Sequence, residues 1–351
     1  MKNRLPVEKF NFPVEKIKAG YYSDAYFLRT EEILNNDQHH PRVLMQVFTR
    51  EHVVVCGTDE VIALFKTCAH NYENIVIHSL HDGDEVEPWE TIMTIEGDLA
   101  DFAHLETIYL GILARESRIA TNVRNVINAA NGKSVLFFPA RYDIYLTQES
   151  DGYAAMIGGL KGFSTDANAL ASGGKGLGTI PHALIATYGG DTVKATDAFD
   201  KHVDPSIARI ALVDFDNDCV NTSLAVARKL GRKLVGVRLD TSGSMVDKSL
   251  WGQIGRFNPT GVCAELVWNV RKALDAEGFD YVKIIVSGGF NPKRIAAFEA
   301  AGVPVDTYAV GSNFFDGNIN FTADIVMVDG KPCAKAGREY LPNDRLEKIE
   351  W

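Results

Sequence analysis

The sequence RIALVDF (209–215) begins a series of short apolar runs that continues with KLVGVRLD (233–240), YVKIIVSGG (281–289) and VPVDTYAVGS (303–312). An earlier run, SVLFF (134–138), has the same character. Continuous valine, isoleucine and leucine runs of this length are typical of strands that are buried on both faces of a parallel sheet. The sequence therefore predicts a set of parallel strands in this part of the chain.

Helical patterns separate these runs. The clearest pattern has Val262, Leu266, Val270 and Leu274 at steps of four, which gives one apolar face, and Gly278 marks its end. Strands that alternate with helices in this way are typical of an α/β barrel or of a doubly wound sheet.

Polar side chains follow the apolar runs at the points where the predicted strands end. Because barrel active sites form at the carboxyl ends of the strands, this repeated placement predicts a site there rather than several unrelated loops. The residues at these positions are Asp214 and Asp216; Arg238, Asp240 and Ser242; Ser287, Gly288 and Gly289; and Gly311 and Ser312.

Two glycine-rich turns, SGGFNP (287–292) and VGSNF (310–314), follow the last two predicted strands. Glycine turns expose backbone N–H groups and let a phosphate approach closely, and a following helix N-terminus adds partial positive charge. Barrels often bind phosphate at the loops after their last two strands. Either turn alone is equally compatible with an ordinary connection, but the two together predict a phosphate site.

Two strand ends carry groups that suit an anionic or aromatic ligand. Arg238 can present paired N–H donors to a carboxylate or phosphate, and Asp240 can bind ribose hydroxyls or Mg²⁺. An internal ion pair between them is the alternative, and both roles are compatible because residues two apart on a strand share a face. After the early strand, Phe138 can stack on a flat ring and Arg141 can meet its negative charge, although core packing is the simpler role for Phe138.

A histidine follows a glycine-rich loop in GGKGLGTIPHALI (173–185). Single histidines are more often structural, but the glycine-rich approach predicts that His182 faces a ligand phosphate as a nucleophile or general acid–base. The loop lacks the lysine–hydroxyl pair of the GxxxxGK[ST] phosphate-binding motif. Asp166 precedes a predicted helix, where a role as N-cap accounts for it.

Charge and composition exclude several classes of protein. The 351 residues carry a net charge of −10, which argues against duplex nucleic acid as the main partner because phosphate backbones need a basic surface. The absence of any apolar run of roughly 18 residues predicts no transmembrane helix, and the first residues lack the apolar stretch of a signal peptide. Five scattered cysteines without a CxxC pair suit a reducing cytoplasm and give no zinc-site spacing.

The order of predicted strands and helices changes near residue 120. Residues 1–120 read as mixed strands and helices, with an amphipathic helix near 100–116. We therefore predict an N-terminal α/β domain over 1–120 and an α/β barrel over 121–330, with the C-terminal segment 331–351 joining the first domain.

Ordered segments from about residue 20 to residue 340 resemble the nicotinate phosphoribosyltransferase family, within the type II group that includes nicotinamide and quinolinate phosphoribosyltransferases. The segments are GYYSDAY, DGDEVEP, HLETIYLGILARESRIAT, FFPARYD, KGFSTDANALAS, GTIPHAL, VDFDND, VRLDTSG, SGGFNP and VGSNFF. The resemblance implies a small N-terminal α/β domain, an irregular TIM-like α/β barrel and a homodimer with shared active sites. It also implies that nicotinate reacts with phosphoribosyl pyrophosphate to give nicotinate mononucleotide and pyrophosphate, in NAD biosynthesis. Mg²⁺ takes part in the implied reaction, and ATP hydrolysis is coupled to it through a transient phosphohistidine.

The resemblance also assigns roles to individual residues. His182 matches the phosphorylated histidine, and Asp214 matches an acid close to it. Positions that hold the pyridine ring, its acid group and the ribose–pyrophosphate match Arg141, Asp166, Arg238 and Asp240. The loops that hold the 5′-phosphate contain Ser287, Gly288, Gly289, Gly311 and Ser312. Tyr21 matches an aromatic residue that stacks on the ring from the partner subunit.

The sequence departs from the family pattern at two positions. Tyr142 follows Arg141 where many members have a second arginine, and Thr241 stands between Asp240 and Ser242. Three other functions stay open: a quinolinate enzyme, a nicotinamide-specific enzyme, and a non-catalytic nucleotide-binding protein on the same scaffold. The histidine of GTIPHAL and the chain length argue against the first, and the retained charged residues argue against the third.

Overall fold

The computed structural model describes residues 4–351, and these residues divide into two compact units. The first unit contains the residues up to Thr121 together with Gly317–Trp351, and the second contains Asn122–Asp316. We predicted the barrel over residues 121–330. In the structure, β12 (Phe321–Val328) instead pairs with β1 (Arg42–Thr49) along its whole length, so this strand lies in the sheet of the first unit.

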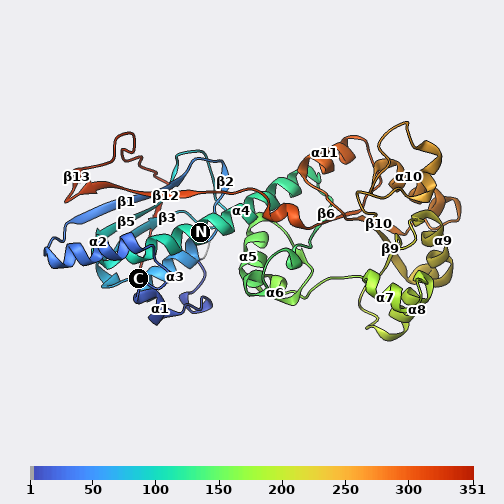
Figure 1. Ribbon diagram of the computed structural model, residues 1–351, viewed down its shortest axis with the longest axis horizontal. Helices are drawn as coiled ribbons and strands as arrows, with labels where there is room; N and C mark the ends of the chain where they lie inside the picture. The colour runs from blue at the N-terminus through green and yellow to red at the C-terminus, as the bar shows by residue number, and fades with distance from the viewer. Residues whose placement is uncertain (1–3) are drawn as a thin grey trace. The chain divides into compact units, whose positions relative to one another are not determined.

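The first unit is built on an antiparallel sheet with the strand order β13-β12-β1-β5-β3-β14. Figure 1 shows β12, from the end of the chain, lying beside β1. The other strands of this sheet are β3 (Val76–Ser79), β5 (Thr91–Asp98), β13 (Lys331–Pro332) and β14 (Glu347–Lys348). A separate pair is formed by β2 (Val53–Val54) and β4 (Glu85–Val86).

The helices of the first unit supply one side of its hydrophobic core. They are α1 (Val14–Lys18), α2 (Ala25–Asn36), α3 (Thr58–Cys68) and the start of α4 (Glu106–Ala129). Phe65 of α3 and Tyr109 of α4 are fully buried with their ring centroids 5.6 Å apart, and they pack among residues of the sheet. The helix predicted near 100–116 begins later than expected, because the Asp98 carboxylate accepts the Ala100 N–H and starts two short 3₁₀ turns before α4.

The second unit contains a parallel sheet with the strand order β7-β6-β11-β10-β9-β8. All five predicted apolar runs contain one of its strands. The bounds are β6 (Ser134–Phe137), β7 (Gly162–Phe163), β8 (Arg209–Leu212), β9 (Leu234–Leu239), β10 (Lys283–Val286) and β11 (Thr307–Val310). The sheet curls into a half-barrel, and its edge strands β7 and β8 do not pair with each other within the described residues. The predicted α/β class and barrel-like architecture are thus confirmed.

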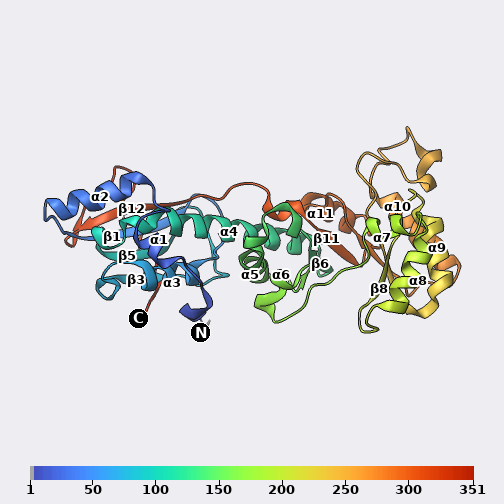
Figure 2. The ribbon, with the colours of Figure 1, turned by 60° about the horizontal axis from the view of Figure 1, so that its bottom comes forward.

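Helices connect the parallel strands of the second unit. They are α5 (Gln148–Gly158), α6 (Asp166–Ala169), α7 (His182–Thr187), α8 (Thr192–His202), α9 (Cys219–Leu230), α10 (Ala264–Ala276) and α11 (Pro292–Ala300). Figure 2 shows α8 beside β8, and α8 also packs against α9. The predicted apolar face is confirmed for Leu266, Val270 and Leu274 of α10, which are fully buried. Val262 is buried too, but it lies before the helix, which begins at Ala264. No helix among residues 4–351 combines the length and apolar character needed to cross a membrane.

The first residue of α4 makes the stability of the first unit depend on pH. Burial, together with the nearby carboxylates of Asp324 and Asp24, raises the pKa of Glu106 to about 7. Because the folded-state pKa is raised, the stability that Glu106 contributes is fully present below its unfolded pKa and is lost as pH rises through about 7.

We expect Glu106→Gln, which imitates the neutral acid, to stabilise the protein at pH 8 by on the order of 2 kcal/mol. At that pH the melting temperature should exceed that of the wild type by several degrees, while at pH 4.5 the two proteins should melt together. Thermal unfolding followed by circular dichroism at both pH values is the measurement. An equal difference at the two pH values would show that the substitution acts through packing instead of charge.

Candidate active site

A cavity of about 410 Å³ opens in the second unit at the carboxyl ends of its strands. This volume suits a small organic ligand. Its lining residues are Phe138, Ala140, Arg141, Tyr142, Ser164, Pro181, His182, Arg238, Asp240, Ser287, Gly288, Gly289, Phe290, Ala309, Gly311 and Ser312. The structure therefore brings most of the residues predicted from the strand ends into one place.

The glycine turns form one wall of this cavity. Gly288 and Gly289 follow β10 with φ angles of +88° and +71°, which are left-handed conformations that only glycine adopts without strain. Gly311 follows β11, and a Cβ at this position would lie 3.0 Å from the Tyr142 ring. Glycine at position 311 therefore leaves room for the Tyr142 ring beside the turn.

A histidine–carboxylate pair lies at the same cavity. Nε2 of His182 is 2.9 Å from Oδ1 of Asp214, and the His182 side chain is 45% exposed whereas Asp214 is almost fully buried. Burial raises the pKa of Asp214 above its ordinary value, and the hydrogen bond and charge of His182 act in the opposite direction. When Asp214 is ionised it can only accept, so Nε2 donates to it and Nδ1 keeps its lone pair. Such a pair can work as a nucleophile or as a general base.

The pairing between Arg238 and Asp240 is loose. Nη2 of Arg238 lies 3.8 Å from Oδ2 of Asp240, while Nη1 donates to the Thr179 hydroxyl over 3.0 Å. The Nε of Arg238 is buried and has no hydrogen-bond partner among the described residues. Burial lowers the pKa of this guanidinium, and the charges of Asp240 and Asp214 counteract the change. A cation held in this way keeps N–H donors for an anionic ligand.

Asp240 is held in place by a neighbouring strand end. Its Oδ1 accepts the Ser287 hydroxyl over 2.7 Å, which leaves Oδ2 as the oxygen that is not engaged at short range. Mg²⁺ is commonly bound by one or two carboxylates together with substrate phosphates and water. Asp240 therefore fits the first of these ligands.

Sequence reasoning missed an arginine that supports the glycine turn. Nη1 of Arg294, on α11, donates to the carbonyl of Gly288 over 2.8 Å and to that of Gly289 over 3.3 Å. Its Nη2 donates to the carbonyl of Val262 over 2.7 Å. Arg294 therefore holds the turn through its backbone carbonyls. The sequence signal for this role was the position of Arg294 five residues after Gly289, on the next helix.

Three of the predicted site residues do not line the cavity: Asp214, which is bonded to His182, Asp166 and Tyr21. Asp216 and Ser242, at the predicted strand ends, are also absent from the lining. Asp166 is the first residue of α6, so its predicted role as N-cap is wrong. The cap is Thr165, whose hydroxyl accepts the Asn168 N–H, because Thr165 has the extended conformation that a cap requires. Asp166 instead accepts the Gly176 N–H over 2.7 Å and so holds the glycine-rich loop that leads to His182.

Tyr21 belongs to the first unit, in the turn before α2. Its ring is largely exposed and meets the Tyr22 ring edge-on, with the centroids 4.9 Å apart. A largely exposed aromatic ring is available to stack on a ligand or on another subunit. Its stacking on the substrate of a partner subunit stays a prediction.

Comparison with known proteins places the chain in a family. The family described as quinolinate phosphoribosyl transferase, N-terminal domain, matches residues 24–117. The crystal structure of nicotinate-nucleotide pyrophosphorylase from Pyrococcus furiosus is 35% identical, with a TM-score of 0.83, and the match covers 97% of this chain and 85% of that one. The chain belongs to the type II phosphoribosyltransferase family.

Other type II phosphoribosyltransferases are more distant. Nicotinate phosphoribosyltransferase of Mycobacterium tuberculosis is 27% identical over 277 residues, which are 76% of this chain and 57% of the relative. That of Bacillus subtilis is 27% identical over 244 residues, 67% of this chain and 44% of the relative. The chain thus spans about half the length of these curated relatives. Human nicotinic acid phosphoribosyltransferase, 14% identical with a TM-score of 0.65, covers 89% of this chain and 76% of its own, and shares the fold.

Proposed function

We propose that the protein is a nicotinate phosphoribosyltransferase that joins nicotinate to phosphoribosyl pyrophosphate, with coupled hydrolysis of ATP, in NAD biosynthesis. The observation that carries the proposal is the half-exposed His182, paired with buried Asp214, at the same cavity as the turns at Gly288 and Gly311. A buried, unreactive histidine far from those turns would have opposed it. The names of the curated relatives from Mycobacterium tuberculosis and Bacillus subtilis support the same activity.

The proposed transfer needs stabilisation of charge more than it needs acid–base chemistry. Cleavage of the bond between C1 of the ribose and pyrophosphate develops positive charge on the sugar and negative charge on the leaving group. Arg238 and Arg141 offer cations to the anionic groups, and the turn at Gly288 offers backbone N–H groups to a phosphate. Phe138 lines the same cavity and offers a flat face to the pyridine ring. Held in this way, the ring nitrogen is positioned for attack on C1.

Mg²⁺ is part of this proposal. Asp240 would hold the ion through Oδ2, with the pyrophosphate of the substrate supplying further oxygen ligands. When bound, the ion neutralises charge that develops on the leaving pyrophosphate. Ser287 keeps the Asp240 carboxylate oriented through its hydroxyl.

The His182–Asp214 pair gives the proposed coupling to ATP a physical basis. With Nε2 donating to Asp214, the Nδ1 lone pair attacks the γ-phosphorus of ATP, the bond to the bridging oxygen breaks, and ADP leaves with that electron pair. The Nδ1 phosphohistidine is then hydrolysed by water to phosphate. While the phosphohistidine exists, it adds negative charge beside the cavity, and this charge changes the affinity for anionic substrate and product.

A quinolinate enzyme is the second candidate. It is supported by the match of residues 24–117 to the quinolinate phosphoribosyl transferase N-terminal domain and by the name of the Pyrococcus furiosus relative. Quinolinate carries two carboxylates, and the cavity presents Arg141 and Arg238 for all anionic groups of both substrates. Nicotinate has one ring carboxylate, so the two arginines have fewer anionic groups to bind than they would with quinolinate. This difference favours nicotinate.

One assay separates these candidates. The protein is incubated with phosphoribosyl pyrophosphate, Mg²⁺ and nicotinate, nicotinamide or quinolinate, each with and without ATP, and nucleotide, pyrophosphate and carbon dioxide are measured. We expect nicotinate to be consumed fastest, with more nucleotide when ATP is hydrolysed. Release of carbon dioxide from quinolinate with no response to ATP would replace the proposal with the second candidate. A faster reaction with nicotinamide would indicate the amide-specific enzyme, and no turnover with any pyridine would indicate a binding protein.

The proposal includes a cytoplasmic homodimer in which Tyr21 of one subunit serves the site of the other. Its largely exposed ring supports this, because an exposed tyrosine is available to another subunit. Light scattering gives the oligomeric state. Nucleotide synthesis in a mixture of Tyr21→Ala and Arg238→Met proteins would then show shared sites, since only mixed dimers contain one intact site.

A further inference from the structure

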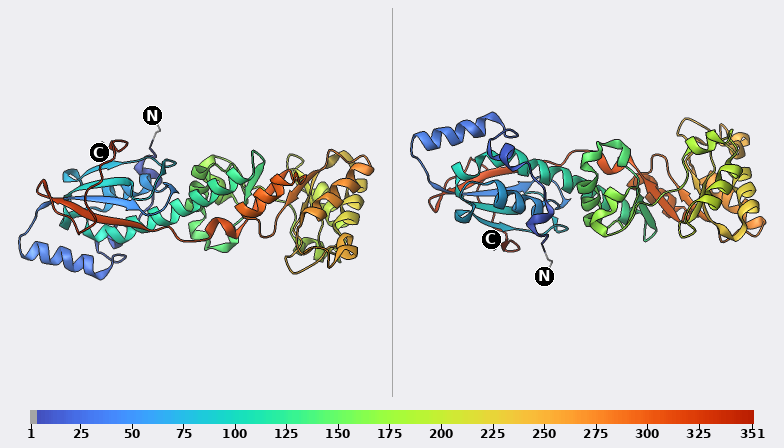
Figure 3. Two further views of the ribbon diagram at one scale, coloured as in Figure 1. Left: turned by 90° about the horizontal axis from the view of Figure 1, so that it is seen from above. Right: turned by 90° about the horizontal axis from the view of Figure 1, so that it is seen from below.

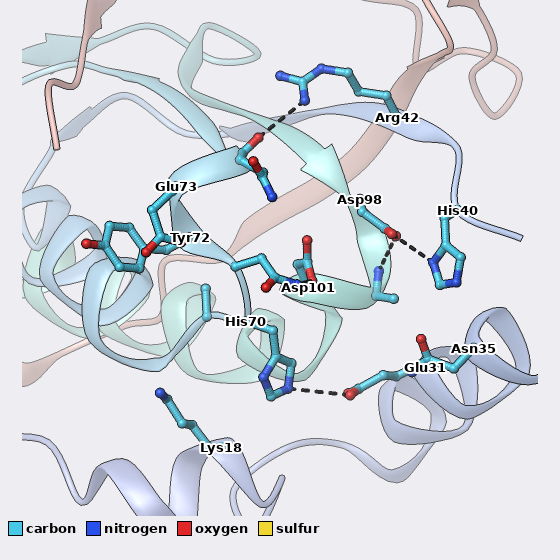
Figure 4. Close-up of a pocket in the computed structure, with 14 residues that line it drawn as sticks. Lys18, Glu31, Asn35, His40, Arg42, His70, Tyr72, Glu73, Asp98 and Asp101 are labelled. Atoms are coloured by element: carbon cyan, nitrogen blue, oxygen red, sulfur yellow. Dashed lines mark hydrogen bonds and ion pairs between the residues drawn. The ribbon is translucent and has the colours of Figure 1, made fainter. Parts of the chain in front are cut away.

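Three potential metal ligands converge in the first unit, at residues that the proposed reaction does not use. Glu31 lies on α2, His70 follows the end of α3, and His104 lies in the 3₁₀ turn Ala103–Leu105 before α4. One ligand atom from each lies within 4.8 Å of the other two. His70 and Glu31 line a cavity of about 1080 Å³, and Figure 4 shows their side chains directed towards each other. Nε2 of His70 is 3.5 Å from Oε1 of Glu31.

His104 has an imidazole nitrogen that the described residues leave without a partner. Its Nε2 lies 3.1 Å from the Cys68 carbonyl, which can only accept, so Nε2 carries the proton. Nδ1 therefore presents a lone pair. This side chain is fully buried, and Nδ1 has no hydrogen-bond partner within the described residues. The Glu31 carboxylate lies nearby, with Oε2 3.9 Å from Nδ1.

The unpartnered Nδ1 of buried His104 and the Glu31 carboxylate are thus two neighbouring electron-pair donors, and His70 adds a third within 4.8 Å. Neighbouring imidazole and carboxylate donors of this kind suit a cation that all of them can bind. We propose that Glu31, His70 and His104 bind a Zn²⁺ ion. The proposal concerns a site in the first unit and is independent of the reaction proposed for the second.

The ligand set matches the coordination chemistry of zinc. Two imidazoles and one carboxylate are zinc ligands at about 2.0–2.2 Å, and a water molecule completes the tetrahedron. The observed separations of 3.5 Å and 3.9 Å exceed those of a closed site only slightly, and rotation of the partly exposed His70 and Glu31 side chains shortens them. The bond from Nε2 of His104 to the Cys68 carbonyl is the orienting contact that metal-bound histidines make.

The surroundings also favour a cation. Burial lowers the pKa of His104, which keeps the imidazole in the neutral form that binds metal. Burial raises the pKa of Glu31, with His70 acting against the rise and Asp101 adding to it, and a bound cation would act in the same direction as His70. The charged side chains that line the cavity, histidines aside, are Glu31, Glu73, Asp98 and Asp101 against Lys18 and Arg42.

The consequence for the fold concerns α2. None of its residues is buried, so apolar packing holds this helix only weakly. Figure 3 shows α2 on the outside of the first unit, joined to the start of β1. A metal ion bound by Glu31 would fasten α2 to the residues around His70 and His104. It would thereby order the adjoining turn that carries Tyr21 and Tyr22.

The test is metal binding by the untagged, full-length protein after treatment with EDTA. Isothermal titration calorimetry with Zn²⁺ should show binding to this site with a Kd on the order of 1 µM or tighter. Co²⁺ in place of Zn²⁺ should give the visible absorption bands of a tetrahedral site. Hydrogen exchange of the α2 amides should slow when Zn²⁺ is added.

Variants assign the binding to these residues. Glu31→Gln and His70→Ala should each weaken Zn²⁺ binding at least roughly tenfold and remove the effect on α2 exchange. Both side chains are partly exposed, which avoids the folding risk of a change at buried His104. His40→Ala is the matched control, because His40 lines the same cavity in an ion pair with Asp98 and is comparably exposed. Full-strength binding by His70→Ala, an equal loss in His40→Ala, or no binding below about 100 µM would overturn the proposal.

Discussion

Replacing His182 with alanine is expected to abolish ATP turnover, by at least roughly 10³-fold, and to make nucleotide synthesis unresponsive to ATP. The reason is that His182 is the only histidine among residues 4–351 that lines the cavity of the second unit, so the substitution removes the proposed acceptor of the γ-phosphoryl group. The measurements are ADP release, phosphate bound to the protein, and nicotinate mononucleotide formed with and without ATP. The bound phosphate should be labile to acid and stable to base, as a phosphoramidate is.

The control for this experiment is His202→Ala. His202 is an exposed histidine at the end of α8, outside the cavity, and its replacement should leave ATP turnover at the wild-type rate. Because His182 is half-exposed at the first residue of α7, its loss should change the melting temperature little. ATP turnover that survives in His182→Ala would remove the phosphohistidine from the proposed mechanism.

Asp214→Asn separates the role of the carboxylate from that of the ring. The amide can still hydrogen bond to Nε2, but it no longer fixes the tautomer or stabilises a cationic imidazole, so ATP turnover should fall on the order of 10²- to 10⁴-fold. In the wild type, ATP turnover should also fall as the pH is lowered and Asp214 becomes protonated. Since burial raises the pKa of Asp214, that fall should begin at a higher pH than for an ordinary aspartate.

The strands of the second unit were predictable from the sequence because they are buried on both faces. Continuous apolar runs such as RIALVDF and KLVGVRLD suit few structures besides a buried strand. KLVGVRLD ends at the cavity with Arg238 and Asp240, and RIALVDF ends beside Asp214, which is bonded to the cavity residue His182. The parallel order then brings Arg238, Ser287 and Gly311 together, although they are far apart in the sequence. Local chemistry and the strand-end rule were therefore enough to predict which residues share this cavity.

The remaining features depend on contacts that no local pattern encodes. β12 belongs to the first unit because it pairs with β1, which lies almost three hundred residues earlier in the chain. The sequence of residues 321–328 has no feature that distinguishes this strand from the strands of the second unit. Arg294 faces the glycine turn only because α11 folds back over it. The cluster of Glu31, His70 and His104 has no spacing motif, since each ligand comes from a different segment. Such sites appear only when tertiary structure places the segments side by side.

Replacing Arg238 with methionine is expected to lower kcat/KM for nucleotide synthesis by about 3 kcal/mol, a factor of roughly 100 or more. Its guanidinium is mostly buried at the cavity and bonded to Thr179, and its ion pair with Asp240 is long at 3.8 Å. Methionine keeps much of the volume and loses the charge, so the loss should be electrostatic. Arg232→Met is the control, because Arg232 lies over the Tyr281 ring outside the cavity and should be neutral for catalysis.

The substrate whose kcat/KM falls most in Arg238→Met identifies the group that Arg238 binds. If it meets the carboxylate of the ring, the loss for nicotinate should exceed that for nicotinamide, and KM for phosphoribosyl pyrophosphate should stay nearly constant. If it meets pyrophosphate, both pyridines should lose equally and that KM should rise. Arg238→Lys should restore only part of the activity, since a lysine cannot offer paired N–H donors. Unchanged kcat/KM with a lower melting temperature would instead make Arg238 a structural partner of Asp240, and the anion site would then have to rest on Arg141 and the glycine turns.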